Sequence, residues 1–90
     1  MSNLSEVTDG DVQGKLLSGE TPTSVYAGKN YGRGSWRVYV TYPGLYEFGL
    51  SAARAETAAA TLNGQGLAHV ARKLQAAARD VRELNGGLDA

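Results

Sequence analysis

Few residues in this 90-residue chain could carry catalysis. The sequence has no Cys and a single His, so thiol nucleophiles, thiolate zinc sites, disulfides and a paired-imidazole metal site are excluded. A serine nucleophile at Ser35 or Ser51 would need a nearby base, and His69 is the only imidazole. The candidate acids and bases are Glu47, Glu56, Asp80 and Glu83. Because their spacing does not place two of them in one cleft, we expect no enzyme activity, no small-molecule substrate, no metal and no cofactor.

A glycine-rich run at residues 27–36, AGKNYGRGSW, could cradle an anion with its backbone amides. A phosphate-binding loop follows a strand and opens a helix, whereas this run joins two predicted strands and lacks the Gly-Lys-Ser/Thr ending. The pattern therefore favours a hairpin loop.

Basic and aromatic residues gather around the same run, with no carboxylate among them. The cluster begins at Tyr26, and the candidates for contact with a nucleic acid are Lys29, Tyr31, Arg33, Arg37 and Tyr39. Cations bind phosphates and planar rings stack on bases, so this set indicates a nucleic-acid-binding sheet face as an alternative function. The other interpretation is an ordinary solvated face, in which Tyr favours the strand and Arg favours solubility.

A second candidate surface is a heptad seam near the C-terminus. Its apolar residues recur at alternating steps of three and four, and they are Leu67, Val70, Leu74, Ala77, Val81, Leu84 and Leu88. The stripe either packs on the chain's own sheet or pairs with a helix of a partner or of a second copy. We nominate the residues from Leu67 to Leu84 as the leading site for partner binding or self-association.

Strands are predicted wherever the hydrophobic period is two, over residues 23–28, 35–42 and 45–50. Pro43 and Gly44 suit the centre of a type II turn, so the last two strands form a hairpin. In the middle strand, the core face carries Trp36, Val38, Val40 and Tyr42, and the open face carries Arg37, Tyr39 and Thr41. One face of the sheet is therefore expected to be core and the other solvated.

Two helices are predicted after the strands. Ser51 is a candidate N-cap for a small-residue helix that stops at Gly64. The heptad seam predicts a longer helix over residues 67–85, which Gly86 and Gly87 end. We expect an α+β fold with a three-stranded antiparallel meander followed by two helices packed on one face. The single domain spans residues 23–88, and residues 1–22 form an acidic, partly flexible segment with one marginal helical turn.

The segment GSWRVYVTYPGLYEFGLSAARAETAAATL, at residues 34–62, carries two resemblances. Its strand, Leu-Ser step and Ala-patterned helix, in a chain rich in Ala and Gly and without Ile, resemble small proteins of actinobacteria and their phages, which implies such an origin. Three antiparallel strands followed by a helix are also similar to AP2-type and integrase arm-binding domains, which lay their sheet in a DNA groove. That resemblance implies outward, DNA-facing positions for Arg37 and Tyr39.

The charge balance limits the partners that the chain attracts. Nine Lys and Arg against nine Asp and Glu give no net charge, so no global basic field draws nucleic acid or membrane. The acidic N-terminus has no signal-peptide core, and no apolar run reaches about 18 residues. We expect a cytoplasmic protein without membrane contact, located in the host cytoplasm if the chain is phage-encoded.

The leading hypothesis is a small non-catalytic interaction or regulatory protein. It would bind a protein partner, or form a homodimer, through its C-terminal helix. Nucleic-acid binding by the basic and aromatic sheet face is one alternative function, and a structural part of a phage particle is another.

Overall fold

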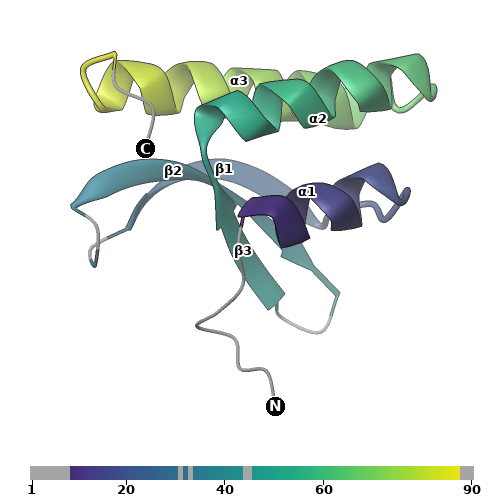
Figure 1. The fold of residues 1–90 in the computed structure, drawn as a ribbon, viewed down its shortest axis with the longest axis horizontal. Helices are drawn as coiled ribbons and strands as arrows, with labels where there is room; N and C mark the ends of the chain where they lie inside the picture. The colour runs from purple at the N-terminus through teal and green to yellow at the C-terminus, as the bar shows by residue number, and fades with distance from the viewer. Residues whose placement is uncertain (1–8, 31, 33, 44–45, 88–90) are drawn as a thin grey trace.

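The computed structural model describes residues 9–30, 32, 34–43 and 46–87 of the chain. Its elements, in chain order, are α1 (Asp9–Leu17), β1 (Ser24–Asn30), β2 (Ser35–Tyr42), β3 (Tyr46–Leu50), α2 (Ala52–Gly64) and α3 (Ala68–Leu84). Figure 1 shows α2 and α3 side by side over the sheet, with α1 next to β3. The predicted α+β class, a three-stranded antiparallel meander followed by two helices, is confirmed.

The sheet has the order β1-β2-β3, and both neighbouring pairs are antiparallel. The ladder between β1 and β2 runs without interruption along the whole of β1. The ladder between β2 and β3 is shorter and extends from Tyr42 back to Val38. These pairings confirm the predicted hairpin between β2 and β3. The predicted type of its turn depends on Gly44, which lies outside the described residues.

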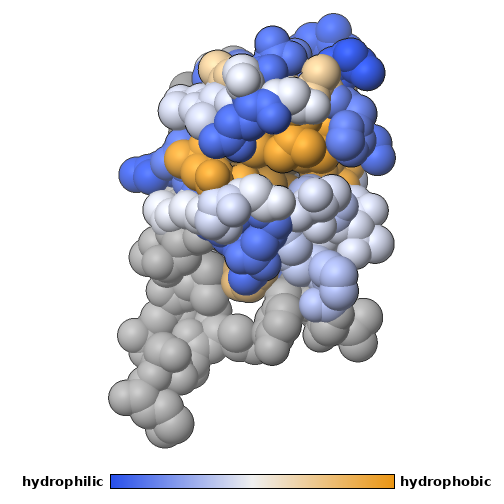
Figure 2. Space-filling model, turned by 90° about the vertical axis from the view of Figure 1, so that its right-hand side faces the viewer, coloured by the Kyte–Doolittle hydropathy of each residue, from blue (hydrophilic) through white to orange (hydrophobic). Residues whose placement is uncertain are grey.

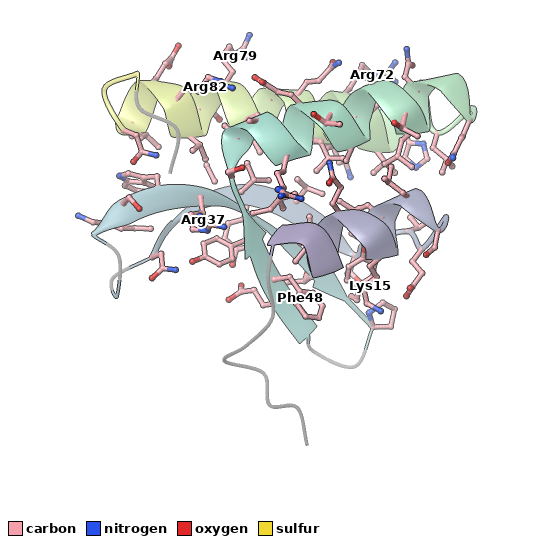
Figure 3. All side chains as sticks on the ribbon, viewed as in Figure 1. Lys15, Arg37, Phe48, Arg72, Arg79 and Arg82 are labelled. Atoms are coloured by element: carbon pink, nitrogen blue, oxygen red, sulfur yellow. The ribbon has the colours of Figure 1, made fainter. Side chains whose placement is uncertain are left out.

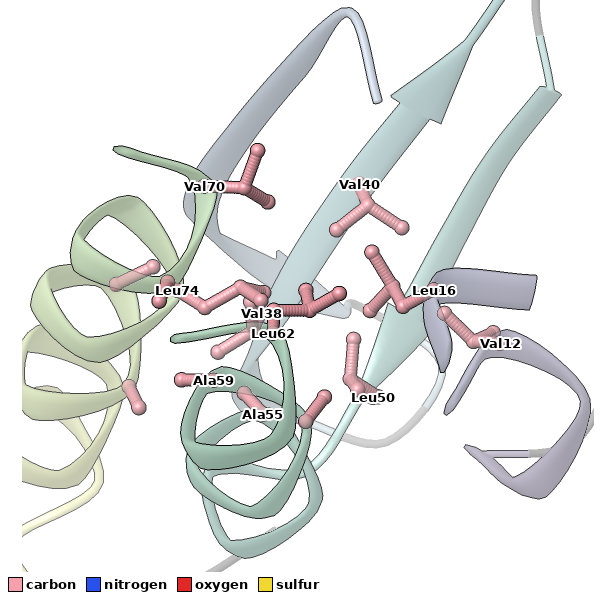
Figure 4. Close-up of a cluster of buried hydrophobic side chains, with 14 of the residues drawn as sticks. Val12, Leu16, Val38, Val40, Leu50, Ala55, Ala59, Leu62, Val70 and Leu74 are labelled. Atoms are coloured by element: carbon pink, nitrogen blue, oxygen red, sulfur yellow. The ribbon is translucent and has the colours of Figure 1, made fainter. Parts of the chain in front are cut away.

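The core lies between the sheet and the helices (Figure 4). Val38 and Val40 of β2 and Leu50 of β3 are fully buried there. The buried residues that α2 contributes are Ala52, Ala55, Ala58, Ala59 and Leu62. Because four of these five side chains are only a methyl group, α2 can pack close to its neighbours. Each fully buried Val or Leu contributes about 1.5–3 kcal/mol relative to an exposed one.

Capping interactions define where α2 begins and ends. The Ser51 side chain accepts a hydrogen bond of 3.2 Å from the Arg54 backbone N–H, which confirms the predicted N-cap. After α2, Gly66 adopts a φ of +83°, and the Leu67 N–H donates to the Leu62 carbonyl at 2.9 Å. This left-handed glycine lets the chain reverse into α3.

The N-terminal segment departs from expectation. One marginal helical turn was predicted there, whereas α1 runs from Asp9 to Leu17. Val12 and Leu16 are 1% and 0% exposed and belong to the core, beside Leu50 and Val40 (Figure 4). Burial of these two side chains offsets the low helix propensity of the glycines in this segment. The domain boundary expected at residue 22 is therefore wrong for α1, while residues 1–8 lie outside the described part of the chain.

Candidate interaction surfaces

The heptad seam packs within this chain. Its central residues, Val70, Leu74, Ala77 and Val81, are buried in the core where α3 lies against α2, β1 and β2. At the ends of the seam, Leu67 is half-buried and Leu84 is 51% exposed, while Leu88 lies outside the described residues. Ala71 and Ala78 are buried as well and widen the stripe to that of a globular helix. The stripe is therefore intramolecular, and its central residues are not available to a partner in this fold.

The outer side of the helix layer is charged. Arg82 of α3 contacts Glu56 of α2 through two hydrogen bonds, of 3.1 Å from Nε and 2.7 Å from Nη2. The hydrogen bond from Arg82 lowers the pKa of the Glu56 carboxyl below its ordinary value, and partial burial opposes that shift. Figure 3 shows Arg72, Arg79 and Arg82 along this outer side. Asp80 and Glu83 are exposed on the same helix, so the surface carries both signs of charge.

The residues nominated for nucleic-acid binding do not form one surface. In the β1–β2 register Lys29 is opposite Trp36, which packs against the core, so Lys29 belongs to the helix-covered face of the sheet. Arg37 and Tyr39 lie on the other face, as predicted, but Arg37 is only 4% exposed instead of solvated. Tyr31 and Arg33 lie outside the described residues.

A pair of stacked tyrosines occupies the sheet face away from α2 and α3. Tyr26 of β1 and Tyr39 of β2 are direct cross-strand neighbours, and their ring centroids are 5.8 Å apart with the planes 25° apart. The Tyr39 ring lies across both neighbouring strands, because a Cβ added at Gly28 or Gly49 would come within 2.8 or 2.9 Å of it. Glycine at these two positions therefore makes room for the central ring. Tyr26 remains 40% exposed.

Hydrogen bonding fixes the outer ring of this pair. The Tyr26 hydroxyl donates to the Glu47 carboxylate of β3, which spans the sheet on this face. This hydrogen bond, together with partial burial, raises the pKa of Tyr26 to about 12. Glu47 itself is exposed, so the face presents an aromatic ring beside a carboxylate. We call Tyr26, Tyr39 and Glu47, with Gly28 and Gly49 between them, the aromatic face.

A second aromatic group lies at the other end of β2, on the helix-covered side. Tyr42 packs edge-on against Phe48 with centroids 6.2 Å apart, and the Lys15 ammonium lies 5.3 Å from the Tyr42 ring centroid. Lys15 also pairs with Glu20 at 3.0 Å. The buried Tyr42 hydroxyl has no hydrogen-bond partner among the described residues. Burial, and secondly the Glu20 charge, raise the pKa of Tyr42 to about 12.

The end of α3 is joined to β2 by one side chain. Asn85 accepts a hydrogen bond from the Trp36 N–H at 2.8 Å and donates one to the Trp36 carbonyl at 2.9 Å. The ladder between β2 and β3 ends at Val38, opposite Leu50. The Asn85 carboxamide therefore satisfies the backbone groups of a β2 residue that β3 does not reach.

Figure 2 shows an apolar band between the charged helix layer and the lower part of the molecule. That side of the molecule carries the end of α1 and the turn between α2 and α3 (Figure 1), where Leu17 and Leu67 pack half-buried against the core. The band is thus the rim of the core rather than a separate site.

Among the described residues, no three acidic or His side chains gather into a metal-binding group. Within the same residues, no helix combines the length and apolarity that membrane spanning requires.

Comparison with family models, with curated proteins and with solved structures gives no match for this chain. The assignment of a site therefore depends on the geometry above. The sequence places Tyr26 in the basic and aromatic cluster, but it does not indicate Glu47 as a site residue. The period-two pattern placed Glu47 on the open face, but the contact with Tyr26 spans three strands and depends on a register that alternation alone does not provide.

Proposed function

We propose that this chain is a small non-catalytic interaction protein that binds a protein partner through its aromatic face. The observation that carries the proposal is the position of Tyr26, a large ring that is 40% exposed on the sheet face away from α2 and α3. The heptad seam, which the sequence favoured for this role, is occupied by the chain's own core.

The aromatic face has the properties of a preorganised contact surface. Tyr26 is held by the ring of Tyr39 on one side and by the Glu47 carboxylate at its hydroxyl. A ring that is already fixed loses little side-chain entropy on binding, and Tyr offers apolar area and a polar tip together. Gly28 and Gly49 leave room for the Tyr39 ring that supports Tyr26. Tyrosine is accordingly enriched in the buried centre of protein interfaces.

The charges on this face favour a protein over a nucleic acid. A phosphate backbone is bound mainly by Lys and Arg. Lys29 belongs to the opposite face, Arg37 is buried, and the exposed charge beside Tyr26 is the Glu47 carboxylate. A carboxylate next to an exposed ring repels phosphate but accepts hydrogen bonds from a partner's amides or cations.

Site-specific photo-cross-linking tests the proposal. The photoreactive residue p-benzoylphenylalanine replaces Tyr26 in one variant and Ala60, which is exposed on the outer side of α2, in a control. We expect a discrete adduct with a different protein from position 26 and none from position 60. The partner identified in that adduct should then bind the purified chain, and Tyr26→Ala should weaken its affinity at least about tenfold, as the loss of an interface anchor does. Glu83→Ala, an exposed change on α3, should leave the affinity unchanged.

Two results would overturn this proposal. The first is equal affinity of the wild type and Tyr26→Ala for the partner. The second is binding of labelled DNA or RNA that weakens strongly between about 50 and 200 mM salt, measured by fluorescence anisotropy, because such a salt slope reports phosphate contacts. The second result would make nucleic-acid binding the function instead.

A further inference from the structure

Strand β1 is an open edge of the sheet. It pairs with β2 on one side, and the described part of the chain provides no strand on the other side. The opposite edge strand, β3, has α1 packed next to it (Figure 1). β1 contains no Pro, its register with β2 is regular from Ser24 to Asn30, and Lys29 is its one charged residue.

The hydrogen-bond pattern shows which backbone groups of β1 face this edge. The Trp36 N–H and carbonyl bind Asn85, so they do not bind Lys29, which is opposite Trp36 in the ladder. Antiparallel ladders alternate between bonded and non-bonded pairs. Val25 and Ala27 are therefore at non-bonded positions too, and their N–H and carbonyl groups point away from β2. A new strand could pair with these groups.

We infer that β1 pairs with β1 of a second copy of this chain, antiparallel and about a two-fold axis at Ala27. The two three-stranded sheets would then form one continuous sheet with both aromatic faces on the same side. This association goes beyond the proposed function, because it uses the strand edge rather than the aromatic face and does not require the partner.

The sequence of β1 is complementary to itself in this register. With Ala27 opposite Ala27, Tyr26 is opposite Gly28 of the second copy. Each of the two large Tyr26 side chains therefore has the smallest residue as its cross-strand neighbour. The Tyr26 side chain leans over the sheet, with its ring on Tyr39 and its hydroxyl on Glu47 of β3, so the ring stays on the aromatic face and leaves the paired edge clear.

The charges on β1 agree with self-pairing. Lys29 is the one charged residue of the strand, and in this register it is opposite Val25 of the second copy. The two Lys29 side chains are consequently at opposite ends of the paired strands, and no like charges face each other. A two-fold arrangement also closes on itself, so it gives a dimer rather than a fibre.

The test is the mass of the protein in solution, measured by light scattering and sedimentation over a wide concentration range. We expect the wild type to reach twice its chain mass of 9.5 kDa as concentration rises. Ala27→Pro removes an outward N–H without removing a bond to β2, and should weaken the dimer at least about tenfold while the monomer stays folded. If Ala27→Pro does not fold, Tyr26→Lys serves instead, because it places a charge at an exposed position of the edge.

Leu84→Asn is the matched control, since Leu84 is the exposed end of the heptad seam. We expect this variant to keep the wild-type mass at every concentration. The inference is overturned if the wild type stays monomeric up to millimolar concentration. It is also overturned if Leu84→Asn dissociates the dimer while the folded β1 variant does not.

Discussion

The two faces of the sheet are built differently. On the helix-covered face, Val38, Val40 and Leu50 are fully buried because α1, α2 and α3 bring separate apolar side chains against them. On the aromatic face, the strands provide their own cover, as Tyr39 lies across Gly28 and Gly49. Strand alternation assigns residues to two faces, but a face without a helix can be organised by one large ring between small neighbours.

The largest effect is expected on the helix-covered face. Leu74→Ala removes a fully buried side chain from the seam of α3 and should lower the free energy of unfolding by about 2–5 kcal/mol. Urea denaturation followed by circular dichroism measures this change. Because the seam is internal, the variant should keep the wild-type dependence of mass on concentration. A loss of association without a loss of stability would mean that the seam binds another chain.

On the aromatic face, adding one methyl group should lower the free energy of unfolding by less than Leu74→Ala does. Gly28→Ala places a Cβ 2.8 Å from the Tyr39 ring and 3.0 Å from the Tyr26 ring, so both stacked rings would have to shift. We expect destabilisation of about 1–3 kcal/mol from this overpacking, measured by the same denaturation. Gly14→Ala is the control, since no atom lies within 4 Å of its added Cβ and the residue is in α1. That change should stabilise the protein by about 0.5–1 kcal/mol.

The next largest loss of stability is expected when the contact between α3 and β2 is removed. Asn85→Ala leaves both the N–H and the carbonyl of Trp36 without their side-chain partner. Because this site is only partly buried and water can reach it, we expect a loss of about 1–2 kcal/mol. Hydrogen exchange of the Trp36 amide should also accelerate in this variant. Unchanged exchange would show that the carboxamide does not protect this end of β2.

The smallest effect is expected from the Tyr42 hydroxyl. Tyr42→Phe removes a buried group that has no partner among the described residues, so stability should rise by about 1 kcal/mol or stay unchanged. The pKa of Tyr42 is raised to about 12 in the folded chain, against 10.0 ordinarily. The folded state therefore retains the proton longer than the unfolded state, and stability should fall as pH rises from about 10 to 12. Tyr42→Phe should make that fall shallower, as measured by urea denaturation at pH 8 and pH 11.

Local signals in the sequence predicted most of the fold. The run SWRVYVTY gave β2 its observed bounds, and Ser51 was recognised as a cap because its type and position suit that role. The helix α1 was underestimated, because its stability comes from burial of Val12 and Leu16 and not from local propensity. The spacing predicts that Val70, Leu74, Ala77 and Val81 share one face, and all four are buried. A heptad has the same spacing whether it faces its own sheet or another chain.

The site was less predictable because its contacts join distant residues. The Tyr26 to Glu47 hydrogen bond spans 21 positions, and the Trp36 to Asn85 contact spans 49. Alternation placed Arg37 on the correct face but could not show that it is buried there. These properties depend on the long-range register of the strands and on which side chains cover each face. Neither can be predicted from a local sequence pattern.

The contact between Asn85 and Trp36 also has a consequence for the chemical ageing of the chain. Asn85 is followed by Gly86. An Asn-Gly step deamidates when the glycine nitrogen attacks the Asn side-chain carbonyl carbon and expels ammonia, and water then opens the resulting succinimide to a carboxylate. In the folded chain the carboxamide is held by Trp36, and the Gly86 N–H donates to the Glu83 carbonyl at 3.1 Å, so both reacting groups are restrained. Deamidation would replace the amide donor by a carboxylate facing the Trp36 carbonyl, and re-closure of the contact would then be opposed by repulsion. Each opening of this end of α3 thus carries a chance of permanent damage, and the accumulated deamidation at Asn85 records how often the helix has detached.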